Sequence, residues 1–204
     1  MILEVHPENP NSREMGMVED ALRNDGVVIY PTDTVYAFGW DISSPKAYDR
    51  IMQIKGKKSK QTNFSIICKD ISMVSEFTLP IGNQIFKLMK RNLPGPFTFI
   101  LPANNNVPRY YKHKKKTIGI RIPDNLIAQD IVERLNRPIM TTSIHDDEDE
   151  IMDYLTDPTM MDERYGHLVD YIIDGGFGDI EPSTVLDCTG NEISVIREGK
   201  GELI

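Results

Sequence analysis

Hydroxyl-bearing side chains follow the first strongly apolar strand in the sequence, where they could contact a ligand. Thr32, Asp33 and Thr34 come directly after the apolar run of residues 27–30. Open α/β sheets bind their ligands beyond the ends of strands, so this position favours a ligand contact. A turn capped by its own hydroxyl groups is the alternative interpretation, because threonine and aspartate also stabilise turns.

A cluster of lysines marks the end of the next predicted helix, which begins at Ser44 and Pro45. The cluster consists of Lys55, Lys57, Lys58 and Lys60. Ammonium groups at this place could hold phosphate, and they would equally complement the negative end of the helix dipole. The lysines alone therefore do not distinguish a phosphate site from a solvated helix end.

Two further predicted strands carry polar side chains on one face. Residues 117–122 alternate strictly, with an apolar face made by Ile118, Ile120 and Ile122 and a second face made by Thr117, Gly119 and Arg121. An extended segment over residues 139–145 would likewise project Thr141, Ser143 and His145 from one face. This pair of strands indicates either a binding site or a solvated surface.

Common signatures of nucleotide and metal binding are absent from the sequence. It contains no G-x-x-x-x-G-K-[ST], no G-x-G-x-x-G, no G-x-S-x-G and no C-x-x-C. The phosphates of a bound nucleotide would therefore be held by lysine, arginine and hydroxyl side chains. The run His145–Glu148 has metal-binding side chains, but carboxylate runs are usually solvated, so we expect no metal held by the protein itself.

The charge is strongly segregated along the chain. The net charge is −8, yet residues 50–121 hold 15 Lys or Arg and only two acids, a local charge of +13 that leaves −21 for the remainder. Nine acids and no Lys or Arg fall within residues 146–163. Because salt screens charges beyond about 8–10 Å, a basic region can attract phosphates in a protein of negative net charge. A polyanionic ligand is therefore not excluded.

The elements that must position these residues alternate between helix and strand and end in paired strands. Helices are predicted over residues 12–24, with a capping box at Asn11–Glu14, over 45–55, over 81–90, and from a cap at Asp124 to residue 135. Mixed helical character is expected in the acidic stretch that runs to about Tyr165. Strands are predicted over residues 1–5, 27–30, 64–68, 97–101, 117–122, 138–143, 171–174, 183–188 and 193–197. Residues 31–36 are expected to form a loop, and residues 104–116 an exposed, mobile basic connection. The pattern predicts a single α/β (α+β) domain over residues 1–204, with three layers and a twisted mixed sheet.

The cysteines and the hydropathy pattern indicate a cytoplasmic protein. Cys68 and Cys188 each lie in an apolar run, where a buried thiol is expected rather than a disulfide. No apolar run reaches the length of about 18 residues that spans a membrane, and residues 1–5 lack the basic flank of a signal peptide.

Eight segments, taken in order, resemble the YrdC domain family of threonylcarbamoyl-AMP synthases. They are Pro31–Gly39, Ile54–Lys57, Leu93–Thr98, Ile118–Pro123, Thr141–Ser143, Asp174–Gly176, Ser183–Asp187 and Arg197–Gly199. The resemblance runs essentially from end to end of the chain and rests on the set, since any one segment is a weak signal.

The resemblance implies a fold and a reaction. The fold is a concave, twisted α/β domain of the YrdC/RibB-like type, whose basic cleft binds ATP, L-threonine and double-stranded RNA. The reaction joins ATP, L-threonine and bicarbonate to give threonylcarbamoyl-AMP and pyrophosphate, a step toward modification of adenosine 37 of tRNA. Magnesium would arrive with the ATP. Longer members carry an additional C-terminal domain, which we do not expect here.

The resemblance also implies roles for particular residues. The catalytic residues would be Lys55, Lys57, Ser143 and His145. ATP would be bound by Lys55, Lys57, Thr117, Thr141, Ser143 and Arg197. L-threonine would be bound by Thr32, Tyr36, Arg121 and Ser183, with the Arg121 guanidinium pairing with its carboxylate.

Three departures from the family pattern leave two functions open. Tyr36-Ala37-Phe38-Gly39 stands where the family commonly has Tyr-Gly-Leu-Gly. Lys57 stands where the family usually has arginine, and His145 where it usually has asparagine. Lysine replaces a planar fork by a point charge, and histidine offers a donor and an acceptor only in the right tautomer. These departures, with Asn63-Phe64 and the opening His6–Pro10, resemble the YciO branch of the family. The chain is then either a synthase of this kind or a nucleotide- or double-stranded-RNA-binding YciO-type paralogue with weak or no synthase activity.

Overall fold

The computed structural model describes residues 1–56, 64–111, 116–144, 155–190 and 192–204. The strands are β1 (Ile2–Glu4), β2 (Val27–Tyr30), β3 (Ala37–Asp41), β4 (Ser65–Ile67), β5 (Phe97–Pro102), β6 (Thr117–Arg121), β7 (Ile139–Ser143), β8 (Tyr171–Asp174), β9 (Thr184–Asp187) and β10 (Ser194–Arg197). The helices are α1 (Ser12–Arg23), α2 (Pro45–Lys55), α3 (Ile71–Phe77), α4 (Asn83–Asn92), α5 (Leu126–Leu135) and α6 (Pro158–Tyr165).

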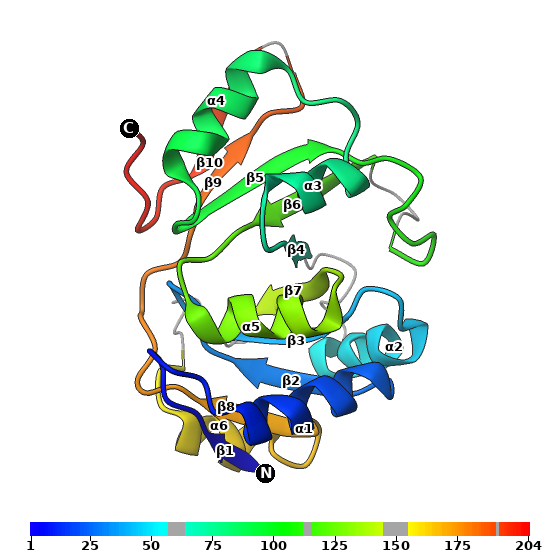
Figure 1. The fold of residues 1–204 in the computed structure, drawn as a ribbon, viewed down its shortest axis with the longest axis vertical. Helices are drawn as coiled ribbons and strands as arrows, with labels where there is room; N and C mark the ends of the chain where they lie inside the picture. The colour runs from blue at the N-terminus through cyan, green and yellow to red at the C-terminus, as the bar shows by residue number, and fades with distance from the viewer. Residues whose placement is uncertain (57–63, 112–115, 145–154, 191) are drawn as a thin grey trace.

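All of these strands belong to one sheet, in the order β1-β8-β2-β3-β7-β4-β6-β5-β9-β10. In Figure 1 this order runs from the N-terminal strand at the bottom to β10 at the top. The sheet is mixed, because β1 pairs in parallel with β8 while β2 and β3 are antiparallel. A mixed α/β fold with one large sheet confirms the predicted fold class.

Amphipathic helices cover the sheet. The helices α1 and α2 pack against β2 and β3, and α1 also packs against α5 (Figure 1). The buried residues of α1 are Met15, Val18 and Leu22, a spacing that puts all three on one helical face. Burial of each such side chain contributes about 1.5–3 kcal/mol to folding, so this face fixes the helix to the core.

Two elements were not predicted from the sequence. The strand β3 was missed because all five of its residues are buried, so it lacks the alternation of a half-buried strand. The helix α3 has only seven residues, too few for a clear helical period. Its start is fixed by the Asp70 side chain, which accepts a hydrogen bond from the Met73 N–H.

Three local predictions were wrong. Asn11 occupies the N-cap position of α1 but makes no side-chain capping bond, because its Oδ1 accepts from the His6 N–H instead. The cap of α5 is Asn125, not Asp124. The connection after β5 is not wholly exposed: Val107 is buried and the Tyr111 hydroxyl donates to the Phe64 carbonyl at 2.8 Å.

The cysteine prediction is confirmed, since Cys68 and Cys188 are both buried free thiols. Burial raises the pKa of both thiols, to about 11 for Cys188. None of the helices in the described ranges has the length and apolarity that crossing a membrane would require.

Candidate functional site

A cavity of about 460 Å³ lies over the centre of the sheet. Strand register builds its floor, because Ser65 pairs with both Thr141 and Gly119, and Gly119 pairs with Ile100. Directly paired residues point their side chains to the same face of a sheet. Four neighbouring strands, β7, β4, β6 and β5, therefore present one continuous surface to the cavity. The polar face predicted for residues 117–121 is part of it, since Thr117, Gly119 and Arg121 all line the cavity.

Gly119 keeps the floor of this cavity low. A Cβ atom at this position would lie 2.3 Å from the Ser65 Oγ and 3.3 Å from the Thr98 Cγ2. Both distances are too short for ordinary van der Waals contact. The space above β6 therefore depends on glycine.

Thr141 can act toward a ligand only as an acceptor. Its hydroxyl donates its single proton to the Phe38 carbonyl at 3.0 Å, so the Tyr30 hydroxyl must be the donor in the 2.8 Å contact between Tyr30 and Thr141. Burial raises the pKa of Tyr30 to about 12, which keeps this phenol protonated. A ligand group next to Thr141 would therefore have to be a donor.

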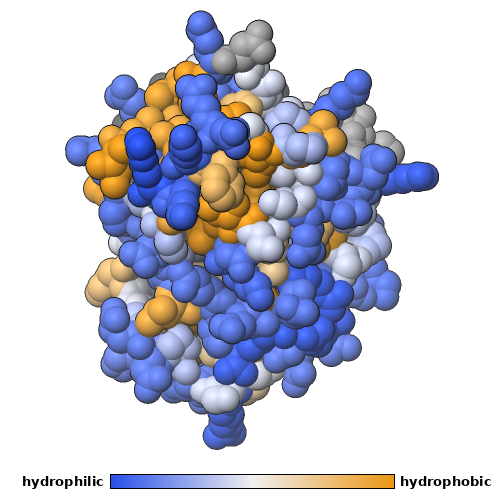
Figure 2. Space-filling view, turned by 45° about the horizontal axis from the view of Figure 1, so that its top comes forward, coloured by the Kyte–Doolittle hydropathy of each residue, from blue (hydrophilic) through white to orange (hydrophobic). Residues whose placement is uncertain are grey.

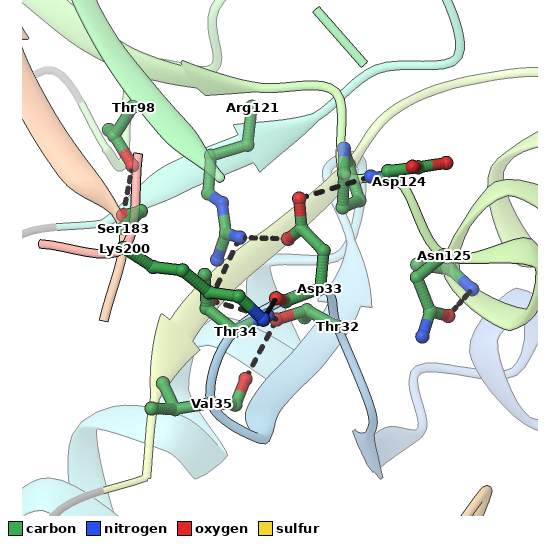
Figure 3. Close-up of polar contacts among 12 residues, drawn as sticks. Thr32, Asp33, Thr34, Val35, Thr98, Arg121, Asp124, Asn125, Ser183 and Lys200 are labelled. Carbon is green, nitrogen blue, oxygen red and sulfur yellow. Dashed lines mark hydrogen bonds and ion pairs between the residues drawn. The ribbon is translucent and has the colours of Figure 1, made fainter. Parts of the chain in front are cut away.

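Arg121 forms one wall of the cavity and is paired within the chain (Figure 3). Its Nη2 donates to the Asp33 Oδ1 at 2.6 Å and to the Thr34 Oγ1 at 3.0 Å. The side chains of Arg121 and Asp33 are each 8% exposed. The Arg121 Nε is fully buried and has no hydrogen-bond partner among the described residues. An unsatisfied buried donor costs about 1–3 kcal/mol, which marks this nitrogen as a place for a ligand acceptor.

Thr32 stabilises the loop that carries Asp33. Its hydroxyl donates to the Val35 carbonyl at 2.8 Å and accepts from the Thr34 N–H at 3.1 Å. The Thr34 hydroxyl, 3.1 Å away, supplies a second proton to it. One donor and two acceptor positions are all that a hydroxyl has, so Thr32 has no capacity left for a ligand in this arrangement. The hydroxyl-capped turn is therefore present at Thr32, while Thr34 lines the cavity and the predicted ligand contact stays a prediction.

Another part of the cavity wall comes from the segment before β9 and from β10. Both Nε and Nη2 of Arg197 donate to the Ser183 carbonyl, at 3.1 and 2.8 Å. The Ser183 hydroxyl lies 2.7 Å from the Thr98 hydroxyl. Ser183 and Arg197, both predicted for the site, are thus held together at the cavity.

Lys55 reaches the rim of the cavity from the end of α2. Its Nζ donates to the Ser143 carbonyl at 3.1 Å, and Ser143 lines the cavity. The helix ends in Gly56, whose φ of 59° is a conformation that favours glycine. The end of α2 is therefore close to the end of β7, where Lys55 contacts Ser143.

A second, more open cavity of about 660 Å³ lies on the other side of the 31–34 loop. Thr32, Asp33 and Thr34 line it, and Thr34 also lines the first cavity. Lys200 joins its walls by donating to the Asp33 carbonyl at 2.9 Å and to the Asp179 carboxylate at 2.8 Å. The bond from Lys200 lowers the pKa of Asp179. The Asp33 loop thus separates two hollows.

Six of the predicted site residues line the first cavity: Thr117, Arg121, Thr141, Ser143, Ser183 and Arg197. Lys55 contacts its rim. Thr32 lies on the second cavity, and Tyr36 is buried with its hydroxyl donating to the Gly176 carbonyl at 2.7 Å. Lys57 and His145 lie outside the described residues, as do Lys58, Lys60 and the run 145–154.

Sequence reasoning assigned no role to three residues that shape the site: Ser65, Thr98 and Lys200. Asp33 was a candidate ligand contact, but its pairing with Arg121, 88 residues away in the chain, was not predicted. Ser65 and Thr98 could have been found from the alternation of their strands. Among the described residues there is no group of three or more metal-binding side chains.

The surface at the α4 end adds an apolar border to the site. Figure 2 shows a hydrophobic area bordered by hydrophilic side chains on this face. The elements at this end include α4 and β10, whose large exposed apolar side chains are Phe86, Val195 and Ile196. Ile196 also lines the first cavity, so apolar surface reaches its rim.

Comparison with known proteins agrees with this fold and site. The Sua5/YciO/YrdC family model, described as "Telomere recombination", matches residues 20–199. YciO of Escherichia coli is 38% identical over 200 residues, covering 98% of this chain and 95% of that protein. The crystal structure of E. coli YciO has a TM-score of 0.90 and covers 99% of this chain and 97% of that one.

Two more distant relatives have functional names. The threonylcarbamoyl-AMP synthase of Coxiella burnetii is 28% identical over 173 residues, which cover 84% of this chain and 91% of the synthase. The crystal structure of P. abyssi Sua5 complexed with L-threonine has a TM-score of 0.88 at 28% identity. It covers 98% of this chain and 57% of the Sua5 chain.

The fold and the polar cavity define a threonylcarbamoyl-AMP synthase-like α/β protein. The chain belongs to the Sua5/YciO/YrdC family.

Proposed function

We propose that the chain is a threonylcarbamoyl-AMP synthase. L-threonine and bicarbonate would form a carbamate with loss of water, and a carbamate oxygen would attack the α-phosphate of ATP. The P–O bond to the leaving group would break and pyrophosphate would depart. The product would carry the threonylcarbamoyl group used for adenosine 37 of tRNA. Support comes from family membership and from the similarity to Sua5, which binds L-threonine.

The observation that carries the proposal is the buried, unpartnered Nε of Arg121 at the cavity wall. A carboxylate is the natural acceptor for a guanidinium donor, and a hydrogen bond to a charged group contributes about 1.5–3 kcal/mol. An amino acid such as threonine brings such a carboxylate. The nearby hydroxyls of Thr98 and Ser183 provide partners for the rest of a small polar substrate.

Two further cations at the cavity suit a polyphosphate. Lys55 reaches the rim beside Ser143, and Arg197 is part of the wall next to Ser183. Attack on an α-phosphate requires positioning and charge stabilisation more than covalent help from the protein. Magnesium bound to ATP would neutralise phosphate charge, while Lys55 and Arg197 would hold and orient the phosphates.

A substrate-omission assay tests the reaction. Purified protein with magnesium, ATP, bicarbonate and L-threonine is expected to release pyrophosphate only when all three substrates are present. Arg121→Gln is expected to lower kcat/KM for threonine about 10–100-fold, the factor that corresponds to one charged hydrogen bond. Pyrophosphate release that is equally fast without threonine would contradict the proposal.

Arg137→Gln is the matched control. Arg137 also pairs with a buried carboxylate, Asp41, at 3.1 Å, but neither residue lines the first cavity. Its turnover should equal that of the unaltered protein. Binding of ATP without any pyrophosphate release would support the other candidate, a nucleotide-binding paralogue.

A further inference from the structure

We propose that Asp33 sets the anion selectivity of the first cavity by controlling which donors of Arg121 a ligand can use. The identity of the natural anion, the carboxylate of threonine, rests on the proposed function. The selectivity itself follows from the contacts of Arg121 and can be measured with a simple anion.

The donors of Arg121 are unequally occupied. Both protons of Nη2 are used, one by Asp33 and one by Thr34. The proton of Nε and the two of Nη1 have no hydrogen-bond partner among the described residues. Each of the two bidentate edges of a guanidinium includes an Nη2 proton, so neither edge is complete. A carboxylate in the cavity can therefore take single bonds from Arg121 but not a two-point fork.

Asp33 also removes the net charge of the wall. Its carboxylate lies 2.6 Å from Nη2, and both side chains are largely excluded from water. An ion pair of this kind attracts a passing anion far less than a lone guanidinium would. Recognition then depends on hydrogen bonds placed at Nε and Nη1. A ligand whose acceptors match the positions of these donors is therefore favoured, and small anions in general are not.

The Asp33 carboxylate is fixed by groups outside the first cavity. Its Oδ2 accepts from the Asp124 N–H at 3.1 Å, just before α5. Its main-chain carbonyl accepts from Lys200 (Figure 3). Lys200 also donates to the Asp179 carboxylate. These contacts keep Asp33 on Arg121, so a ligand carboxylate is not expected to displace it.

The test measures binding of sodium acetate to the full chain at constant ionic strength. Asp33→Asn removes the charge but keeps an oxygen near Nη2, which leaves a buried cation without a counter-charge. We expect this variant to bind acetate at least about tenfold more tightly than the unaltered protein, as a shift of the melting temperature with acetate concentration. Acetate should then also displace L-threonine from the variant, and much less effectively from the unaltered protein.

Asp41→Asn is the matched control, because it removes a buried carboxylate from a different arginine, Arg137. It should leave acetate affinity unchanged. If Asp33→Asn does not fold, Thr34→Val supplies the test, since it frees one Nη2 proton and should tighten acetate binding about threefold. Acetate binding by Asp33→Asn that is no tighter than that of the control would overturn the proposal, as would no gain in a folded Thr34→Val.

The acetate titration requires neither ATP nor turnover. A protein that shows the predicted acetate gain without synthase activity would retain the Asp33 inference and lose the proposed reaction. A protein with synthase activity but no gain in acetate binding would retain the proposed reaction and contradict the Asp33 inference.

Discussion

Arg121 and Gly119 show how two residues on one strand face can have opposite effects on the same cavity. Arg121 adds a guanidinium whose Nη2 protons are already bonded to Asp33 and Thr34. Gly119 has no side chain and so leaves open space above β6. The space above Gly119 is bordered by Ser65 and Thr98 from the strands on either side of β6. The size of the cavity is thus set by single atoms on three adjacent strands.

Gly119→Ala is expected to reduce both stability and ligand binding. The new Cβ would lie 2.3 Å from the Ser65 Oγ, which must rotate away, and it would also crowd the Ser65 Cβ at 3.1 Å and the Thr98 Cγ2 at 3.3 Å, at a cost of about 1–3 kcal/mol in unfolding free energy. Chemical denaturation and ATP titration measure the two effects. Gly16→Ala in α1 is the control, because its Cβ meets nothing within 4 Å, and it should stabilise the protein by about 1 kcal/mol. Equal effects of the two substitutions would contradict this account.

At the scale of elements, the start of α5 supports the first cavity although none of its residues lines that cavity. The Asp124 N–H binds Asp33, and the next residue, Asn125, caps the helix by accepting from the Ala128 N–H at 3.0 Å. The cap therefore fixes the direction in which the preceding N–H points. The start of α5 is therefore coupled to the cavity wall through the Asp124 main-chain N–H.

Asn125→Ala is expected to lower the unfolding free energy by about 1 kcal/mol, the usual loss for an N-cap side chain. Asn11→Ala is the matched control, since Asn11 has the same position on α1 without a capping bond. Urea denaturation of both variants gives the comparison. A loss at Asn11 as large as at Asn125 would show that the capping bond is not the cause.

At the scale of the whole molecule, five buried or partly buried tyrosines hold their protons more tightly than exposed ones do. Burial raises the pKa of Tyr30 to about 12 and also raises the pKa of Tyr36, Tyr48, Tyr110 and Tyr111. An unfolded tyrosine ionises near about 10. The folded state therefore holds these protons more tightly than the unfolded state does.

This difference predicts loss of stability in alkali. Because the folded pKa values are raised, their contribution is complete below about pH 10 and is lost as the pH rises through about 12. The melting temperature should be nearly constant at about pH 8–9 and fall steeply above about pH 10. Tyrosinate absorbance of the buried share should appear together with unfolding. Full ionisation in a protein that is still folded at about pH 10 would refute the prediction.

The sequence was sufficient for features with a local cause and insufficient for those that need the assembled sheet. The alternation of residues 117–121 predicted which side chains share a face of β6, and the polar set of Thr117, Gly119 and Arg121 lines the cavity. The pairing of Asp33 with Arg121 has no local signal, because it depends on how β2 and β6 are ordered in the sheet. Asn11 shows the converse. The local sequence has the capping-box spacing, but the Asn11 side chain accepts from the His6 N–H and does not cap the helix.

The cavity draws its walls from Thr34 near one end of the chain and Arg197 near the other. A similar separation holds for β1, whose partner among the described strands is β8. Such distant pairings form late and slowly during folding. On the ribosome, the cavity therefore cannot be complete until Arg197 has emerged. Ligands can stabilise the finished protein, but they cannot guide the growing one.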